Sequence, residues 1–153
     1  MAEREGDVYV FVIKGRPITK KNSSRWAGRG KLLPSASYKA YAEAAVWQLK
    51  EQMRRQDLDP SGREPIPYAM AVTCHYWMPS QQSWPDLVGL LQATSDILQA
   101  AGIIKDDGLI VDYGSSRIEG IDKGNPRVWI SIHTITPGDP VYKINPKLKG
   151  VKE

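Results

Sequence analysis

The sequence is poor in cysteine and histidine, and this scarcity excludes several kinds of site. Cys74 is the only cysteine among 153 residues, so no disulfide can form within the chain. The chain has two histidines, and no Cys or His cluster has the spacing of a zinc site. A single unpaired thiol fits a reducing compartment, and we therefore expect a cytoplasmic protein.

Long apolar runs are also missing. The N-terminal segment MAEREGD is charged and lacks the apolar region of a signal peptide, and no run of about 18 apolar residues could span a bilayer. The sequence contains no internal repeat or low-complexity tract. These absences predict a protein without a membrane partner.

The length and composition predict one globular domain. With 153 residues and 41% apolar residues, the chain can bury one core but is too short for two ordinary domains. We expect a single domain over residues 1–136. Residues 137–153 form a basic, proline-containing tail that we expect to be poorly ordered.

The positive charge is unevenly distributed. Lys and Arg outnumber Asp and Glu by 21 to 17, which favours a polyanionic partner only weakly. Between residues 14 and 31, however, there is no acidic residue and seven basic ones: Lys14, Arg16, Lys20, Lys21, Arg25, Arg29 and Lys31. This basic stretch predicts a cationic arm.

Hydrophobic periodicity predicts an α+β fold in which a small mixed β-sheet is packed with two main helices. The first helix is expected over 38–55 with Ser37 as its N-cap, and the second over 87–101 with Asp86 as its N-cap and Gly102 just beyond its end. The strands are expected over 7–14, 68–78, 109–118 and 127–135, and residues 15–37 are expected to form a long loop.

Aspartates cluster in the second half of the chain, and this is its clearest chemical signal. The acidic residues between Trp84 and Tyr113 are all aspartates: Asp86, Asp96, Asp106, Asp107 and Asp112. Aspartate-bound Mg²⁺ can activate water and neutralise a phosphate, which phosphodiester hydrolysis requires. Purely structural roles are also open, namely an N-cap for Asp86, a turn at Asp107-Gly108, and a solvated helix face for Asp96.

The helix between these aspartates limits how they can combine. Asp86 precedes a helix that we expect to be roughly 22 Å long, whereas Asp106 and Asp107 follow it. The two ends can share a metal ion only if the chain folds back along the helix, or if a neighbouring subunit supplies one of the ligands.

Two segments carry a resemblance to a known family: GRPITKKNSSRW, starting at Gly15, and WMPSQQSWPDLVGLLQATSDILQAAGIIKDDGLIVDY, starting at Trp77. They resemble the RusA-like Holliday junction resolvases, which have a GRP-type basic loop, a P-D-x-D-N-L-x-K helix opening and a G-x-x-x-D-D-x-x-V loop and strand. The resemblance covers residues 8 to about 135. It implies a Mg²⁺-dependent endonuclease, with Mn²⁺ as a substitute metal, that acts on four-way DNA junctions as a homodimer. Such proteins are often carried by phages or prophages.

The resemblance assigns roles to individual residues. Asp86 matches the first metal-binding aspartate of the family, Asp107 matches the last, and Asp106 matches the acidic neighbour before it. Three positions depart from the family: Val88 replaces the second aspartate, Gly89 an asparagine, and Gln92 the helix lysine near the scissile phosphate.

Two residues are candidates to compensate for these departures. Asp96 lies on the same helix face as Val88 and Gln92, although two turns from Val88, and is a candidate metal ligand. Arg117 is a candidate to neutralise charge in the transition state, with a solvated strand position as the alternative.

The basic stretch supplies the expected DNA contacts. Phosphate contacts are expected from Lys20, Lys21, Arg25 and Arg29. Trp26 could stack on an unpaired base or cover the core, and Gln92 is expected to face the DNA at the position of the family lysine. Three functions therefore compete: a junction-resolving endonuclease, a catalytically impaired junction-binding relative, and a structural protein with an incidental basic loop. The aspartate cluster favours the first.

Overall fold

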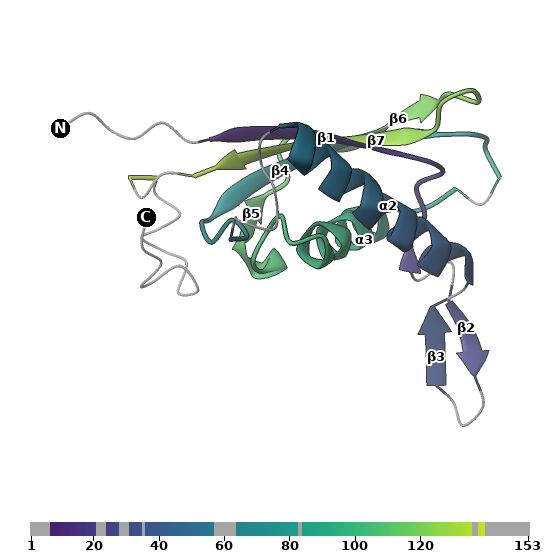
Figure 1. Ribbon diagram of the computed structural model, residues 1–153. Helices are drawn as coiled ribbons and strands as arrows, with labels where there is room; N and C mark the ends of the chain where they lie inside the picture. The colour runs from purple at the N-terminus through teal and green to yellow at the C-terminus, as the bar shows by residue number, and fades with distance from the viewer. Residues whose placement is uncertain are drawn as a thin grey trace.

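The computed structural model describes residues 7–20, 24–27, 31–34, 36–56, 64–82, 84–135 and 138–139 (Figure 1). In chain order the elements are β1 (Val8–Lys14), β2 (Ser24–Ala27), β3 (Lys31–Pro34), α2 (Ala36–Arg55), β4 (Met70–Met78), α3 (Leu87–Ala100), the 3₁₀ helix η1 (Asp107–Leu109), β5 (Ile110–Asp112), β6 (Arg117–Ile121) and β7 (Arg127–Thr134).

Strand β4 organises the main sheet. On one side it pairs antiparallel with β7, which in turn pairs antiparallel with β1. On its other side β4 pairs in parallel with β5 near its start and with β6 near its end. Between these two short strands, Ser116 Oγ accepts a hydrogen bond from Cys74 N (2.9 Å). The hydroxyl therefore satisfies a backbone group of β4 that neither strand pairs.

Both helices cover the same face of the sheet (Figure 1). Alternate residues of β4 are buried beneath them, as expected for a strand with one face in the core: Met70, Val72, Cys74, Tyr76 and Met78. From α2 the core receives Ala45, Leu49 and Met53, and from α3 it receives Leu90, Ile97 and Leu98. This mixed sheet with two main helices confirms the predicted α+β class.

The outer edge of β1 is covered by glutamine side chains of α2. Gln52 accepts a hydrogen bond from Val12 N (2.8 Å) and donates one to Val12 O (2.6 Å). Gln48, one turn earlier, forms the same pair of bonds with Lys14 (2.8 and 3.1 Å). Gln56 donates to a third carbonyl of the strand (3.1 Å). The helix therefore supplies the bonds that another strand would make, which protects an edge prone to unwanted pairing.

The opposite face of the sheet is partly open. The guanidinium carbon of Arg127 lies 4.0 Å from the centre of the Trp77 ring, and the His75 ring packs edge-on against Trp129 at 5.5 Å. Val8 remains 56% exposed at the start of β1. Cys74 and His75 therefore face opposite sides of β4, as their adjacent positions in a strand predict.

Three sequence predictions about the elements were wrong. The expected loop over 15–37 contains the hairpin β2–β3, whose strands are too short to give a periodic signal. The strand expected over 109–118 is divided between η1, β5 and β6. Ser37 is not the N-cap of α2, because the helix already includes Ala36. Such boundary errors of one or two residues are usual.

No helix in the described part of the chain is long and apolar enough to cross a membrane. The expected poorly ordered tail lies, apart from residues 138–139, outside the described residues.

Candidate active site

Asp86 stands at the N-terminus of α3, as predicted. Its backbone is extended, and its Oδ2 accepts a hydrogen bond from Gly89 N (3.0 Å). This bond satisfies one of the free N–H groups in the first turn of the helix. The side chain is exposed, and a carboxylate has further lone pairs. Asp86 can therefore act as an N-cap and still accept a cation.

Asp106 and Asp107 lie in the acidic loop, defined here as residues 105–108, which follows α3. Gly102, at φ 78°, turns the chain at the end of the helix. The loop is fixed by two bonds: Asp107 N donates to Gln99 Oε1 (3.0 Å), and the Asp106 carboxylate accepts from Gly108 N (2.8 Å). The two carboxylates are thus held beside the C-terminal end of α3.

Negative charge accumulates around Asp107. Desolvation makes the largest contribution to raising its pKa, followed by a side-chain hydrogen bond with Asp106 and by the charges of Asp96 and Asp106, while Gly108 N opposes the shift. The neighbouring carboxylates make ionisation of Asp107 less favourable. A bound cation would relieve the repulsion, and hard oxygen donors suit Mg²⁺.

A groove along α3 connects the start of the helix with the acidic loop. It is lined by Val88, Leu91, Gln92, Ser95, Asp107 and Tyr113. Tyr113 Oη and Ser95 Oγ are hydrogen-bonded (2.9 Å), which fixes the segment after β5 to the helix. Val88, where the family has an aspartate, is 74% exposed. A metal ion could reach an exposed side chain at this position, but the side chain of valine cannot coordinate it.

Asp96 is already paired with a lysine. Its Oδ2 lies 2.9 Å from the ammonium of Lys20, which comes from the segment after β1. Asp96 therefore lies close enough to affect Asp107 electrostatically, but its carboxylate holds a protein cation.

The structure brings together only part of the predicted metal site. Within the described residues, no group of three or more His, Cys, Asp or Glu side chains could hold a metal ion. Asp106 and Asp107 are adjacent and Asp96 is near, but Asp86 is at the opposite end of α3. The backbone of the acidic loop is fixed beside Gln99, in the last turn of α3, whereas the groove lined by both Val88 and Asp107 runs back from it toward the start of the helix.

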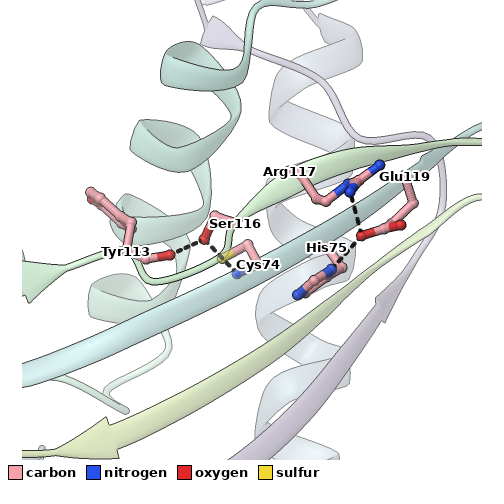
Figure 2. Close-up of polar contacts among 6 residues, drawn as sticks. All are labelled: Cys74, His75, Tyr113, Ser116, Arg117 and Glu119. Carbon is pink, nitrogen blue, oxygen red and sulfur yellow. Dashed lines mark hydrogen bonds and ion pairs between the residues drawn. The ribbon is translucent and has the colours of Figure 1, made fainter.

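Arg117 lies away from this groove. Its Nε is 3.3 Å from Glu119 Oε1, which also contacts His75 Nδ1 at 2.6 Å (Figure 2). His75 belongs to the face of β4 that the helices leave uncovered, whereas Ile118 packs against the core. Arg117 therefore points to the open face of the sheet, and this position gives no support to its predicted role beside the acidic loop.

The predicted DNA contacts are only partly described. The side chain of Lys20 contacts Asp96 of α3, and Gln92 lines the groove. Arg25 and Trp26 belong to β2, in a hairpin that projects from the body of the protein (Figure 1). Lys21 and Arg29 lie outside the described residues.

Sequence reasoning missed the contact between Thr19 and Gly89. Thr19 is buried, and a Cβ at position 89 would lie 2.9 Å from Thr19 Cγ2 and 2.9 Å from Asp86 Oδ1. A glycine within the first turn of a helix is a signal of such close approach. The bond between Ser95 and Tyr113 had no comparable signal, because both residue types are common on surfaces.

Comparisons with known proteins identify the family of the chain. The family model described as "Endodeoxyribonuclease RusA" matches residues 14–133. A protein of Aquifex aeolicus (strain VF5) named "Crossover junction endodeoxyribonuclease RusA" is 26% identical over 116 residues, which cover 76% of this chain and 83% of the relative. The matched segment includes α2, α3, the acidic loop and strands β4 to β7 apart from the last residue of β7, but only the last residue of β1. The chain belongs to the RusA family of endodeoxyribonucleases.

Proposed function

We propose that this protein is a Mg²⁺-dependent, structure-selective endonuclease that resolves four-way DNA junctions by paired phosphodiester hydrolysis as a homodimer. The observation that carries the proposal is the concentration of carboxylates at the acidic loop, where the charges of Asp96 and Asp106 help to raise the pKa of Asp107. This repulsion is what a divalent cation would relieve. The groove along α3 gives a phosphate access to the same place.

The residues present fit a hard divalent cation. Asp106 and Asp107 offer adjacent oxygen donors, and Mg²⁺ typically takes one or two carboxylates and completes its shell with water and substrate phosphate. When bound, the ion would supply an activated water and neutralise charge on the phosphate. We expect Mn²⁺ to substitute, because it also accepts oxygen ligands.

The position of Asp86 favours a second copy of the chain. One Asp86 and one Asp107 of the same chain lie at opposite ends of α3, but two chains with antiparallel α3 helices would bring Asp86 of each near the acidic loop of the other. A closed twofold dimer makes such reciprocal contacts. A four-way junction has near twofold symmetry and needs paired nicks, so it suits this assembly.

The DNA contacts follow from the positive charge near α3. Lys20 contacts Asp96 of α3, one turn beyond Gln92 of the groove, and the β2–β3 hairpin carries Arg25 and Trp26 away from the body of the protein. Basic side chains give affinity through phosphates without reading sequence. A tryptophan can stack on a base that is unpaired at the junction centre.

Cleavage of a synthetic four-way junction tests the function. We expect wild-type protein with Mg²⁺ or Mn²⁺ to introduce symmetric nicks, and Asp107→Asn to abolish them without loss of junction binding. Absence of wild-type cleavage with every divalent metal would exclude the enzyme. Binding without cleavage would then support the alternative, a catalytically impaired junction-binding protein, which Val88 and Gln92 favour.

Mixing two inactive variants tests the shared site. If Asp86 and Asp107 of different chains act together, mixed dimers of Asp86→Asn and Asp107→Asn contain one intact site. An equimolar mixture then recovers about a quarter of the wild-type sites, if subunits assort at random. Nicking should return while each variant alone stays inactive. A mixture as inactive as its components would show that the site is not shared in this way.

A further inference from the structure

The segment Gly15–Lys20, which follows β1, is attached to α3 and to the loop before it. Arg16 Nη2 donates a hydrogen bond to Gln82 O, four residues before Asp86. Thr19 is 1% exposed and lies against Gly89. This one segment therefore contacts the loop before α3 and the first turn of the helix. Through Lys20 it also contacts Asp96 in the third turn.

Gly89 makes this attachment possible. Any side chain at position 89 would begin with a Cβ 2.9 Å from Thr19 Cγ2, closer than such atoms approach. Glycine is less favourable than alanine within a helix, so the close approach of Thr19 gives a physical reason for glycine at this position. The departure from the family asparagine at this position therefore coincides with the docking of Thr19.

The docked segment delivers the Lys20 ammonium to α3. Lys20 Nζ is 2.9 Å from Asp96 Oδ2 and 5.7 Å from the centre of the Tyr38 ring. Asp96 is one turn beyond Gln92 on the same helix face, and its charge acts on Asp107. The Lys20 side chain is 48% exposed, so it is oriented by these contacts and still open to a ligand.

We propose that Lys20 is a catalytic residue of this site: its ammonium contacts the phosphate at the scissile bond and takes the place of a cation that α3 itself lacks. Asp96 is then a positioning residue that holds Lys20 in the absence of DNA. The inference rests on the proposed nuclease function, and it gives Asp96 a different role from that of a metal ligand.

The charges of α3 support this assignment. The helix contains no lysine or arginine, and Asp96 is its one ionisable residue. A phosphate that enters the groove beside Gln92 therefore meets no cation from α3. Because an ammonium is a compact charge on a flexible stem, Lys20 can exchange Asp96 for a phosphate oxygen while Thr19 keeps the backbone in place. Cations placed where charge develops in phosphoryl transfer lower the barrier.

Lys20→Met tests the proposal, with Lys50→Met as the matched control. Both variants remove one lysine charge, but Lys50 is exposed on α2 and lies outside the basic stretch that is expected to contact DNA. We expect single-turnover cleavage by Lys20→Met to fall about 100-fold, and Lys50→Met to cleave like wild type. Lys20→Arg should recover part of the loss, because it retains the charge. Thermal unfolding checks that each variant folds.

Junction binding with Ca²⁺ gives a second measurement, which does not depend on cleavage. Loss of one phosphate contact should reduce the slope of log K against log salt by about 1 in Lys20→Met and leave it unchanged in Lys50→Met. Equal slopes and equal cleavage in the two variants would overturn the proposal. If wild-type protein binds but does not cleave, the nuclease function fails, whereas the slope still tests the contact of Lys20 with phosphate.

Asp96→Asn separates the two roles of Asp96. As a positioning residue, it should matter only while Lys20 is present, so Asp96→Asn should lower cleavage in wild type and add little to Lys20→Met. A metal ligand would behave differently, because Asp96→Asn would then abolish the remaining cleavage of Lys20→Met. That result would assign Asp96 to the metal and overturn its role in holding Lys20.

Discussion

The carboxyl group of Asp106 lies beside that of Asp107 at the C-terminal end of α3 and helps to raise the pKa of Asp107. Desolvation makes the largest contribution to this shift, and the charge of Asp96 adds to it. This relationship makes the acidic loop sensitive to pH.

The first prediction concerns this sensitivity. If Asp107 binds the metal ion in its ionised form, as proposed, acidification should stop cleavage at a higher pH than for an unperturbed aspartate. Asp106→Asn removes a charge and should lower the pKa of Asp107, which a carboxyl-carbon NMR titration of the metal-free protein measures directly. Asp112→Asn is the control, because Asp112 does not contribute to the shift. An unchanged Asp107 titration in Asp106→Asn would contradict the coupling.

The same shift predicts an effect on stability. Because the pKa of Asp107 is raised in the folded state, its contribution to stability is fully present below its unfolded pKa and is lost as pH rises through the folded pKa. Above that range the ionised side chain is unfavourable. Asp107→Asn should therefore unfold at a higher denaturant concentration than wild type near neutral pH, although the proposed function predicts that it does not cleave. Equal or lower stability would contradict this prediction.

Two substitutions at Asp86 separate its structural and chemical roles. Asparagine is as good an N-cap as aspartate, so Asp86→Asn should retain the bond to Gly89 N and leave the free energy of unfolding nearly unchanged. Asp86→Ala removes the cap and should cost about 1 kcal/mol. Both variants remove the carboxylate and should lose cleavage. Urea denaturation and junction cleavage measure the two effects, and full activity in Asp86→Asn would exclude a role for the charge.

The sequence alone predicted the positions of the helices and long strands, because each of these elements has a strong local signal. The apolar stripe of α3, Asp86 before it and Gly102 after it all act within a few residues, and the structure confirms them. The short elements β2, β3, β5 and β6 lack this signal. Their positions depend on pairing with strands distant in the chain, as when β6 joins the edge of β4 beyond β5.

The candidate site was harder to predict for the same reason. The types of residue near α3 could be anticipated, but their partners come from other elements. Lys20 reaches Asp96 across 76 positions of sequence, and Arg117 turns to the open face of the sheet because Ile118 occupies the core face. A strand residue's face depends on the register of the whole sheet, which one irregularity between β4 and β6 shifts.

The glutamines that cover β1 lead to a fourth prediction. Gln52→Met keeps a side chain of similar length but removes both bonds to Val12. Two partly buried backbone groups would lose their partners, which should cost about 1–3 kcal/mol. Lys50→Met, at an exposed position of the same helix, is the matched control and should change stability little. Equal free energies of unfolding for the two variants would show that the edge needs no such bonds.

Cys74 should be chemically inert in the folded protein. Its side chain is 1% exposed, and burial raises the pKa of the thiol to about 12. The thiolate is the reactive form, so alkylation by iodoacetamide should be negligible at mildly alkaline pH and rapid after denaturation. Mass spectrometry of native and denatured samples measures the difference. Rapid labelling of the native protein would contradict the burial of β4 beneath the helices.

Two glycines with positive φ provide the last prediction, because they share a backbone strain but differ in their surroundings. Gly114 has φ 52° and Gly102 has φ 78°. A Cβ at Gly114 would lie 2.5 Å from Thr73 Oγ1, whereas nothing lies within 4 Å at Gly102. Alanine at either position would have to adopt a left-handed backbone conformation, which costs about 1–2 kcal/mol of stability.

Gly114→Ala should therefore destabilise the protein more than Gly102→Ala. The excess is the cost of moving Thr73 or the segment between β5 and β6. Thr73→Ala removes the colliding oxygen, so the two glycine variants should have similar free energies of unfolding when each is combined with it. If Gly114→Ala is no worse than Gly102→Ala in the wild-type background, the chain between β5 and β6 does not pass as close to β4 as the structure places it.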